Sequence, residues 1–191
     1  MDKKEDLRVI KTKNILYNTL LEVLKEKPFE EIKVSDICNR ALVNRSTFYA
    51  HYSDKYELFS SYISDLKESL ISELKKNENI HTSKEYFLEM IRLFLNHIEE
   101  KKNFYSSIMV NNRNSIIMYM LYNTFNTEIK EEIEKKGNIK GIPVPTSFIS
   151  KFYLGAVISI GMDVIENPNK YKKEELVKYF DYLIPEEPYG K

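Results

Sequence analysis

A short stretch of polar side chains near residue 45 has the composition of a nucleic-acid reader. Arg45 and Ser46 follow Asn44, a residue type that commonly caps helices, so both are expected in the first turn of a short helix. A guanidinium can bond guanine through two atoms, and in a helix-turn-helix the first residues of the second helix face base edges. We therefore expect Arg45 and Ser46 to read bases; the alternative is a solvent-exposed helix end.

A short helix and a turn must hold this reader in place. Ile37 and Ala41 fall on one face, with the small Cys38 beside Ile37, so the helix that carries them can pack closely against its successor. Ser35 is its expected N-cap and is counted among the DNA contacts. The stretch 42–44 interrupts the apolar pattern and predicts the turn.

This stretch resembles the helix-turn-helix of the TetR/AcrR transcriptional regulators. The matching residues stand at fixed spacings: Phe29, Ile32, Ile37, Ala41, Val43, Thr47, Phe48, Tyr49, His51, Tyr52, Lys55 and Leu58. The resemblance covers the first third of the chain. It implies phosphate contacts at four positions with suitable donors: Thr47, Tyr49, His51 and Lys55. Phe48 and Tyr52 are expected to fill the core, and a structural role is the alternative for His51.

Two residues depart from the family pattern. Leu42 stands where the family usually has glycine, and a leucine in the left-handed conformation costs about 1 kcal/mol. We therefore expect the turn to be shaped differently here. Cys38 replaces a usual alanine, which changes little.

Composition limits the classes of function. With 29 basic and 29 acidic residues the formal net charge is zero, so a DNA-binding surface must be local; basic residues do outnumber acidic ones between Lys33 and Lys55. A single cysteine forms no internal disulfide and suits a reducing cytoplasm. The start has no apolar signal region, and no uninterrupted apolar run long enough to span a bilayer follows. We expect a cytoplasmic protein that does not enter membranes.

Beyond the motif, apolar residues recur at the three- and four-residue spacing of helices, without strand-like alternation. The chain is predicted to be all-α, with about nine helices. Residues 1–54 would form a three-helix DNA-binding domain with the helix-turn-helix, and residues 55–191 a helical effector-binding and dimerisation domain. One long helix, from residue 55 to about 76, would join them.

The last two long helices are predicted to form a homodimer. They carry more apolar residues than one face of a small domain can bury, among them Phe148, Phe152, Tyr153, Phe180 and Leu183. Small residues of the first of these helices would let a second copy approach closely: Gly155, Ala156, Ser159 and Gly161.

Aromatic and methionine side chains could line a cavity for a small, largely apolar effector. The candidates are Tyr62, Phe87, Met90, Phe94, Met120 and Tyr153. The same side chains could instead simply fill the core, and the sequence leaves both readings open.

Nothing in the sequence indicates catalysis. His81 and His97 are isolated from Cys38 and from each other, and there is no metal-ligand spacing, nucleophile elbow or glycine-rich phosphate loop. No enzyme activity, cofactor or metal is expected. We expect a DNA-binding regulator that binds a palindromic operator as a dimer, with repression following the family habit. The alternatives are a helical interaction module and a ligand-independent regulator that acts through a partner protein.

Overall fold

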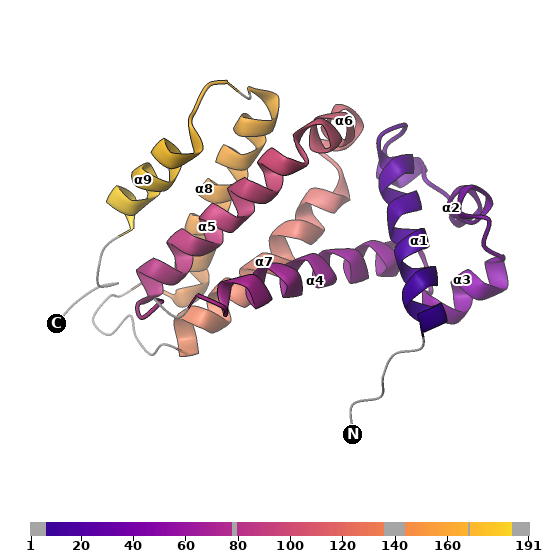
Figure 1. The fold of residues 1–191 in the computed structure, drawn as a ribbon, viewed down its shortest axis with the longest axis horizontal. Coiled ribbons are helices and arrows are strands. Elements are labelled where there is room, and N and C mark those ends of the chain that lie inside the picture. The colour runs from indigo at the N-terminus through magenta and orange to yellow at the C-terminus, as the bar shows by residue number, and fades with distance from the viewer. Residues whose placement is uncertain (1–6, 78–79, 136–143, 168, 185–191) are drawn as a thin grey trace. The chain divides into compact units, whose positions relative to one another are not determined.

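The computed structural model describes residues 7–77, 80–135, 144–167 and 169–184, and all regular structure among them is helical (Figure 1). The elements are α1 (Leu7–Leu24), the 3-10 turn η1 (Phe29–Glu31), α2 (Val34–Ala41), α3 (Arg45–His51), α4 (Lys55–Leu74), α5 (Ser83–Glu100), α6 (Lys102–Asn112), α7 (Ile116–Lys135), α8 (Thr146–Glu166) and α9 (Lys173–Leu183). The all-α prediction is confirmed.

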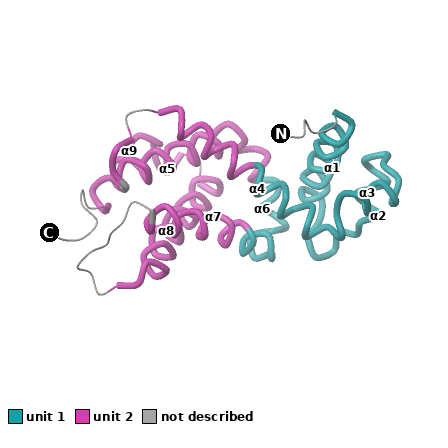
Figure 2. Tube along the Cα trace, turned by 90° about the horizontal axis from the view of Figure 1, so that it is seen from below, with its two compact units in different colours: residues 1–65, 107–120 teal, residues 66–106, 121–191 magenta. Residues whose placement is uncertain are grey.

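The chain forms two compact units, and no single cut separates them (Figure 2). Unit 1 comprises Met1–Asp65 and Ser107–Met120, whereas unit 2 comprises Leu66–Ser106 and Leu121–Lys191. This division differs from the expected boundary after residue 54. The first half of α4 belongs to unit 1, and so does the corner where α6 ends and α7 begins.

Unit 1 is built on the apolar stripe of α1. Leu16, Leu20 and Leu24 recur every four residues and are fully buried, as are Ile37 of α2 and Phe48 of α3. A buried side chain of this size contributes about 1.5–3 kcal/mol by leaving water, and truncating a buried phenylalanine to alanine costs about 3–5 kcal/mol. Phe48 therefore fixes α3 to the rest of the unit.

The turn between α2 and α3 is left-handed, so the expectation of a differently shaped turn was wrong. Leu42 has φ 54° and ψ 38°, and among the described residues it is the only non-glycine with positive φ. The Val43 N–H bonds the Cys38 carbonyl at 3.0 Å, the pattern of a Schellman helix end that usually employs glycine. The Leu42 side chain is 93% exposed, so no burial offsets its strain.

Leu42→Gly should therefore stabilise the protein. Removing the Cβ relieves a left-handed strain of about 1–2 kcal/mol, and the greater freedom of glycine in the unfolded chain takes back about half of that. We expect the free energy of unfolding in urea to rise by about 0.5–1 kcal/mol. Leu42→Ala removes the exposed side chain but keeps the Cβ, and it should leave stability almost unchanged. An equal gain in both variants would contradict the backbone explanation.

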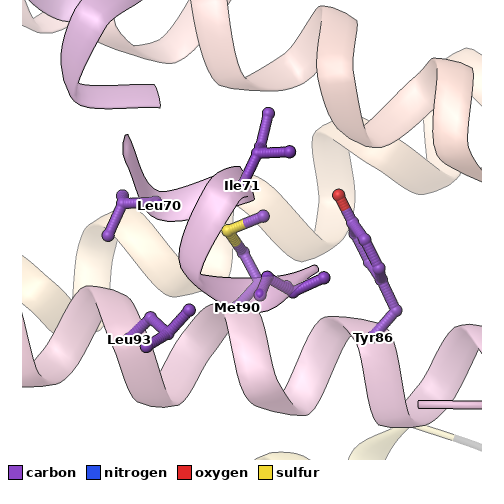
Figure 3. Packing of buried hydrophobic residues seen from close by; sticks show 6 residues of the cluster. Leu70, Ile71, Tyr86, Met90 and Leu93 are labelled. Carbon is purple, nitrogen blue, oxygen red and sulfur yellow. The ribbon is translucent and has the colours of Figure 1, made fainter. Parts of the chain in front are cut away.

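In the part of unit 2 that the structure describes, the helices pack around three apolar clusters. The first lies between α4 and α5 and contains Leu70, Ile71, Leu74, Tyr86, Met90 and Leu93 (Figure 3). The second joins α5 to α9 and contains Ile91, Leu95, Leu176, Phe180 and Ile184. The third joins α7 to α8 and contains Ile129, Ile133, Ile149 and Leu154. Phe180 is thus a core residue of one protomer, which corrects its placement on the dimer face.

Helix α8 leaves much of its apolar surface uncovered. Phe148 and Phe152 are 62% and 64% exposed, and Ala156 and Ser159 continue the same exposed face. By length and composition alone α8 could cross a membrane, but core helices of soluble proteins can be equally long and apolar. Only 28% of the most apolar part of α8 is buried. Gly161, on the buried side, lets α5 approach, because a Cβ there would lie 2.9 Å from Cε1 of Phe94.

A hydrogen-bonded pair in unit 2, His97 and Tyr105, gives the free energy of unfolding a pH dependence. The Nε2 atom of His97 lies 2.7 Å from the Tyr105 hydroxyl, and burial, helped by the charge of Lys101, lowers the pKa of His97 below its ordinary 6.5. The unfolded chain therefore takes up this proton more readily than the folded one. The stability that comes from keeping the His97 ring neutral is fully present above pH 6.5 and is lost as the pH falls below that value.

We expect the free energy of unfolding to fall between pH 7.5 and pH 5.5 by less than about 1 kcal/mol through this group, because solvent screens a partly exposed ring. His97→Gln keeps a polar group beside Tyr105 without a titrating proton, and urea unfolding at the two pH values should show a smaller fall for this variant. An equal fall in the free energy of unfolding for the variant and wild type would show that His97 does not cause the pH dependence.

Candidate nucleic-acid interface

Helix α3 buries one face and presents the other to solvent. Phe48 is fully buried, whereas Arg45, Ser46 and Tyr49 are exposed. The Tyr49 ring stands edge-on against Phe48, with ring centroids 5.5 Å apart, so the exposed ring rests on a fixed support. The helix thus offers a guanidinium and two hydroxyls from a surface that is anchored in the core.

Arg45 is free to bind a partner. In the part of the chain that the structure describes, no hydrogen bond or ion pair holds its guanidinium. Thr47 and His51 are half-buried at the flank of the same helix. Asn44 occupies the predicted N-cap position, with ψ 144°, but its side chain makes no capping bond.

The start of α2 differs from the prediction. The helix begins at Val34 with Lys33 as its N-cap, so Ser35 lies in the first turn and is not the cap. The Asp36 carboxylate instead accepts the Lys33 N–H at 3.0 Å and the Lys27 ammonium at 2.5 Å. The Lys27 ammonium and the Lys33 N–H hold the pKa of Asp36 below its usual value. Ser35 is half-buried, and its DNA contact stays a prediction.

Lys55 has a structural task that the sequence did not reveal. Its ammonium donates to the carbonyls of Phe29, Glu30 and Ile32, at 2.7, 2.9 and 2.7 Å. It also lies 4.9 Å from the centroid of the Phe29 ring. Burial lowers the pKa of Lys55, an effect that Glu30 opposes. An ammonium has three donors, so none remains for a phosphate in this arrangement.

Lys55→Met should therefore act on stability and leave the electrostatics of DNA binding alone. Losing three charge-assisted hydrogen bonds at a partly exposed site should cost about 2 kcal/mol of unfolding free energy. Each phosphate contact contributes about 0.9 to the slope of log Kd against log salt. We expect that slope to stay unchanged in the folded variant. A slope lower by about one would mean that Lys55 binds phosphate when DNA is present.

A polar network that periodicity did not predict ties α1 to α4. The Tyr17 hydroxyl lies 2.7 Å from Ser61 Oγ and donates to Asp65 at 3.0 Å, while Lys13 pairs with Asp65 at 2.9 Å. Burial raises the pKa of Tyr17, so the hydroxyl keeps its proton. The network fixes the direction of α4 within unit 1. In the sequence, this network is indicated only by Ser61 and Asp65, which stand four residues apart in α4.

The candidate effector residues are distributed over both units. Phe87, Met90 and Tyr153 meet at the apolar clusters of unit 2, and Phe87 packs against all three clusters. Phe94 rests against Gly161 of α8. Tyr62 and Met120 belong to unit 1, where Tyr62 stacks edge-on against Tyr17. These two residues therefore fall outside the unit that holds the other candidates, and their contact with an effector stays a prediction.

Two family models match the chain. The model of "Bacterial regulatory proteins, tetR family" matches residues 16–62, which hold the helix-turn-helix. A second model, "Transcriptional regulator C-terminal region", matches residues 85–186, more than half of the chain.

Curated relatives agree with these models. The chain is 40% identical over 63 residues to an HTH-type transcriptional regulator of Bacillus subtilis, YxbF; this match covers 32% of the chain but only 17% of that relative. It is 24% identical over 165 residues to DhaS of Lactococcus lactis, an HTH-type dhaKLM operon transcriptional activator, covering 85% of the chain and 83% of DhaS.

Solved structures share the fold. A TetR transcriptional regulator from Streptococcus agalactiae has a TM-score of 0.64 at 24% identity, covering 94% of this chain and 96% of its own. The transcriptional regulator FadR from Bacillus subtilis, solved in complex with stearoyl-CoA, has a TM-score of 0.58 at 17% identity, covering 89% and 96%.

Proposed function

The chain belongs to the TetR family of DNA-binding transcriptional regulators, and from this premise we propose that it binds a palindromic operator as a homodimer and represses transcription until a small apolar effector releases it. The observation that carries the proposal is Arg45, which is exposed and unpaired among the described residues, on a helix whose other face is anchored by Phe48. A regulator that reads bases needs such a rigid support for its reading side chains.

The proposed DNA contacts fall into two kinds, to base edges and to phosphates. Arg45 and Ser46 read base edges, because they stand at the start of the recognition helix. Four further side chains with donors position the helix on the phosphates: Ser35, Thr47, Tyr49 and His51. Lys55 is left out of this set, since its donors already bond carbonyls.

The exposed face of α8 supports a dimer. Phe148 and Phe152 are followed on the same face by Ala156 and Ser159, so the aromatic end can bury a large area and the small end allows close approach. Tyr182 and Leu183 of α9 are exposed as well. Two copies joined there would form a four-helix bundle, and a dimer places two recognition helices on one operator.

An effector would act by changing the distance between those helices. Helix α4 starts directly after the helix-turn-helix and continues into unit 2, so tilting α4 moves α2 and α3. Half-sites lie about 34–36 Å apart, and a misfit of a few ångströms opposes binding. The effector must prefer the DNA-incompetent state, because equal affinity for both states shifts nothing. Aromatic and methionine side chains of unit 2 offer apolar contacts to a small, largely apolar molecule, and FadR, which shares the fold, was solved with stearoyl-CoA.

Activation is a second candidate for the direction of regulation. It is favoured by the likeness to DhaS, an activator, over 85% of the chain. DNA binding through α3 is common to both candidates. They differ in whether the bound protein lowers or raises transcription from the adjacent promoter.

The test begins with selection of duplexes from random DNA, which should return an inverted repeat. Transcription in vitro from a promoter that carries this repeat then separates repression from activation. Hydrophobic metabolites that raise the melting temperature of the free protein are titrated into the protein–operator complex. If no metabolite that binds the free protein changes operator affinity, the proposed effector response is wrong. If the selection returns no preferred sequence, the proposed sequence-specific recognition is wrong.

A further inference from the structure

The corner between α6 and α7 (Ser107–Met120), called the corner below, is part of unit 1 although it is far from the helix-turn-helix in sequence (Figure 2). At its centre lies Asn112, the last residue of α6, with a fully buried side chain. A buried amide needs partners, because leaving one of its groups unpaired costs about 1–3 kcal/mol. The partners of Asn112 therefore indicate what this residue holds.

Asn112 holds the connection between α1 and η1. Its Oδ1 accepts the N–H of Phe29 at 2.7 Å, and its Nδ2 donates to the carbonyls of Leu24 at 2.9 Å and Ile108 at 3.2 Å. Leu24 is the last residue of α1 and Phe29 the first of η1, so one amide joins two helix ends. The neighbouring Asn111 donates to the carbonyl of Lys25 at 2.9 Å.

A carboxylate makes the reciprocal connection. Glu30 of η1 accepts the Ser115 hydroxyl at 2.9 Å and the N–H of Ile116 at 3.0 Å. Ile116 is the first residue of α7, where a negative charge also suits the helix dipole. The backbone bond from Ile116 is the main reason that the pKa of Glu30 lies below its usual value.

Lys55 reaches the same turn from the other side. It bonds the carbonyls of Phe29, Glu30 and Ile32, and Ile32 lies two residues before the start of α2. The turn η1 is therefore shared by the corner, by the first residue of α4 and by the lead into the helix-turn-helix. Any displacement of the corner must move η1 or break buried hydrogen bonds.

We propose that Asn112 and Glu30 are positioning residues for DNA binding: through η1 they make the corner a second element, besides α4, that sets where α2 and α3 lie. The proposal rests on the proposed function in one respect, namely that α3 reads the operator. The chain passes from unit 2 into unit 1 within α6 and returns to unit 2 within α7. A conformational change in unit 2 can therefore reach α2 and α3 along α6 and α7 as well as along α4.

The test compares variants matched in charge. Glu30→Gln keeps an oxygen that can accept both hydrogen bonds, whereas Glu30→Ala keeps none; both remove the same negative charge. Asn112→Leu preserves volume and removes all three bonds. We expect Glu30→Ala to bind the selected operator about tenfold more weakly than Glu30→Gln, and Asn112→Leu to bind at least about tenfold more weakly than wild type. All titrations use full-length protein under conditions where urea unfolding shows the variants to be folded.

Ser150→Ala is the control for loss of stability alone. Ser150 is fully buried in unit 2 and donates to Asn126 at 2.9 Å, so this variant loses a buried hydrogen bond elsewhere and should keep wild-type operator affinity. Hydrogen exchange supplies a readout that needs no DNA: peptides over residues 24–40 should exchange faster in Glu30→Ala and Asn112→Leu, but not in Glu30→Gln or Ser150→Ala.

The outcomes separate this inference from the proposed function. If wild type binds the operator and the Glu30→Ala and Asn112→Leu variants bind it equally well, the positioning role is overturned while operator recognition stands. If no operator is found, the exchange measurement still decides, and unchanged exchange over residues 24–40 in both variants would overturn the inference.

Discussion

Replacing Arg45 with alanine should relax sequence selectivity more than any other single change on the surface of α3. A guanidinium that bonds a guanine through two atoms contributes about 1–3 kcal/mol of discrimination. We therefore expect operator affinity to fall about 5- to 150-fold, while affinity for random duplex falls far less. Fluorescence anisotropy with both duplexes at one salt concentration measures the two constants.

Arg40→Ala is the matched control for this experiment. Arg40 is also exposed in unit 1 and its loss removes the same charge, but it lies on α2 and pairs with Glu26. Arg40→Ala should keep the ratio of the two affinities. If Arg45→Ala kept that ratio too, α3 would not read bases through Arg45, and the assignment of the recognition helix would need revision.

Gly155→Arg should separate the dimer while leaving each protomer folded. A Cβ at Gly155 would meet no described atom within 4 Å outside its neighbouring residues and the backbone of its own helix, and an arginine also favours a helix by about 0.8 kcal/mol over glycine, so the protomer should not lose stability. The added side chain would instead project beside Ala156, on the face where a second copy must approach closely. Sedimentation at micromolar concentration should show twice 22.7 kDa for wild type and 22.7 kDa for the variant.

The loss of the dimer should appear in DNA binding as well. A monomer engages one half-site only, so affinity for the inverted repeat should fall by about 100-fold or more, whereas affinity for an isolated half-site should stay unchanged. Thr127→Arg adds the same charge on the exposed surface of α7 and should remain dimeric. A wild-type protein that sediments only as 22.7 kDa would exclude the dimer.

The recognition helix could be predicted from local patterns because its signals are local. The N-cap position of Asn44 and the burial of Phe48 beside exposed Arg45 follow from residues within one or two turns. The start of α2 was placed wrongly for the same reason: Ser35 is a good capping residue, but the Asp36 carboxylate bonds the N–H of Lys33 and sets the cap there.

Residues whose partners lie far away in sequence could not be placed. Lys55 looks like a phosphate ligand until the tertiary fold brings the carbonyls of residues 29–32 to its ammonium. The sequence shows Asn112 only as a helix end, and its hydrogen bonds to the Phe29 N–H and the Leu24 carbonyl appear only in the tertiary fold. Phe180 and Phe152 have similar sequence surroundings, yet one is core and the other exposed, because helical spacing does not tell which face a neighbouring helix covers.

The central claim is that two copies of this chain recognise two related half-sites, and one titration tests it directly. Wild-type protein is titrated by fluorescence anisotropy against the selected inverted repeat, the same duplex with one half-site scrambled, and a fully scrambled duplex. We predict two chains per intact repeat and a loss of at least about 100-fold in affinity when one half-site is scrambled. Equal affinity for the three duplexes would contradict the account.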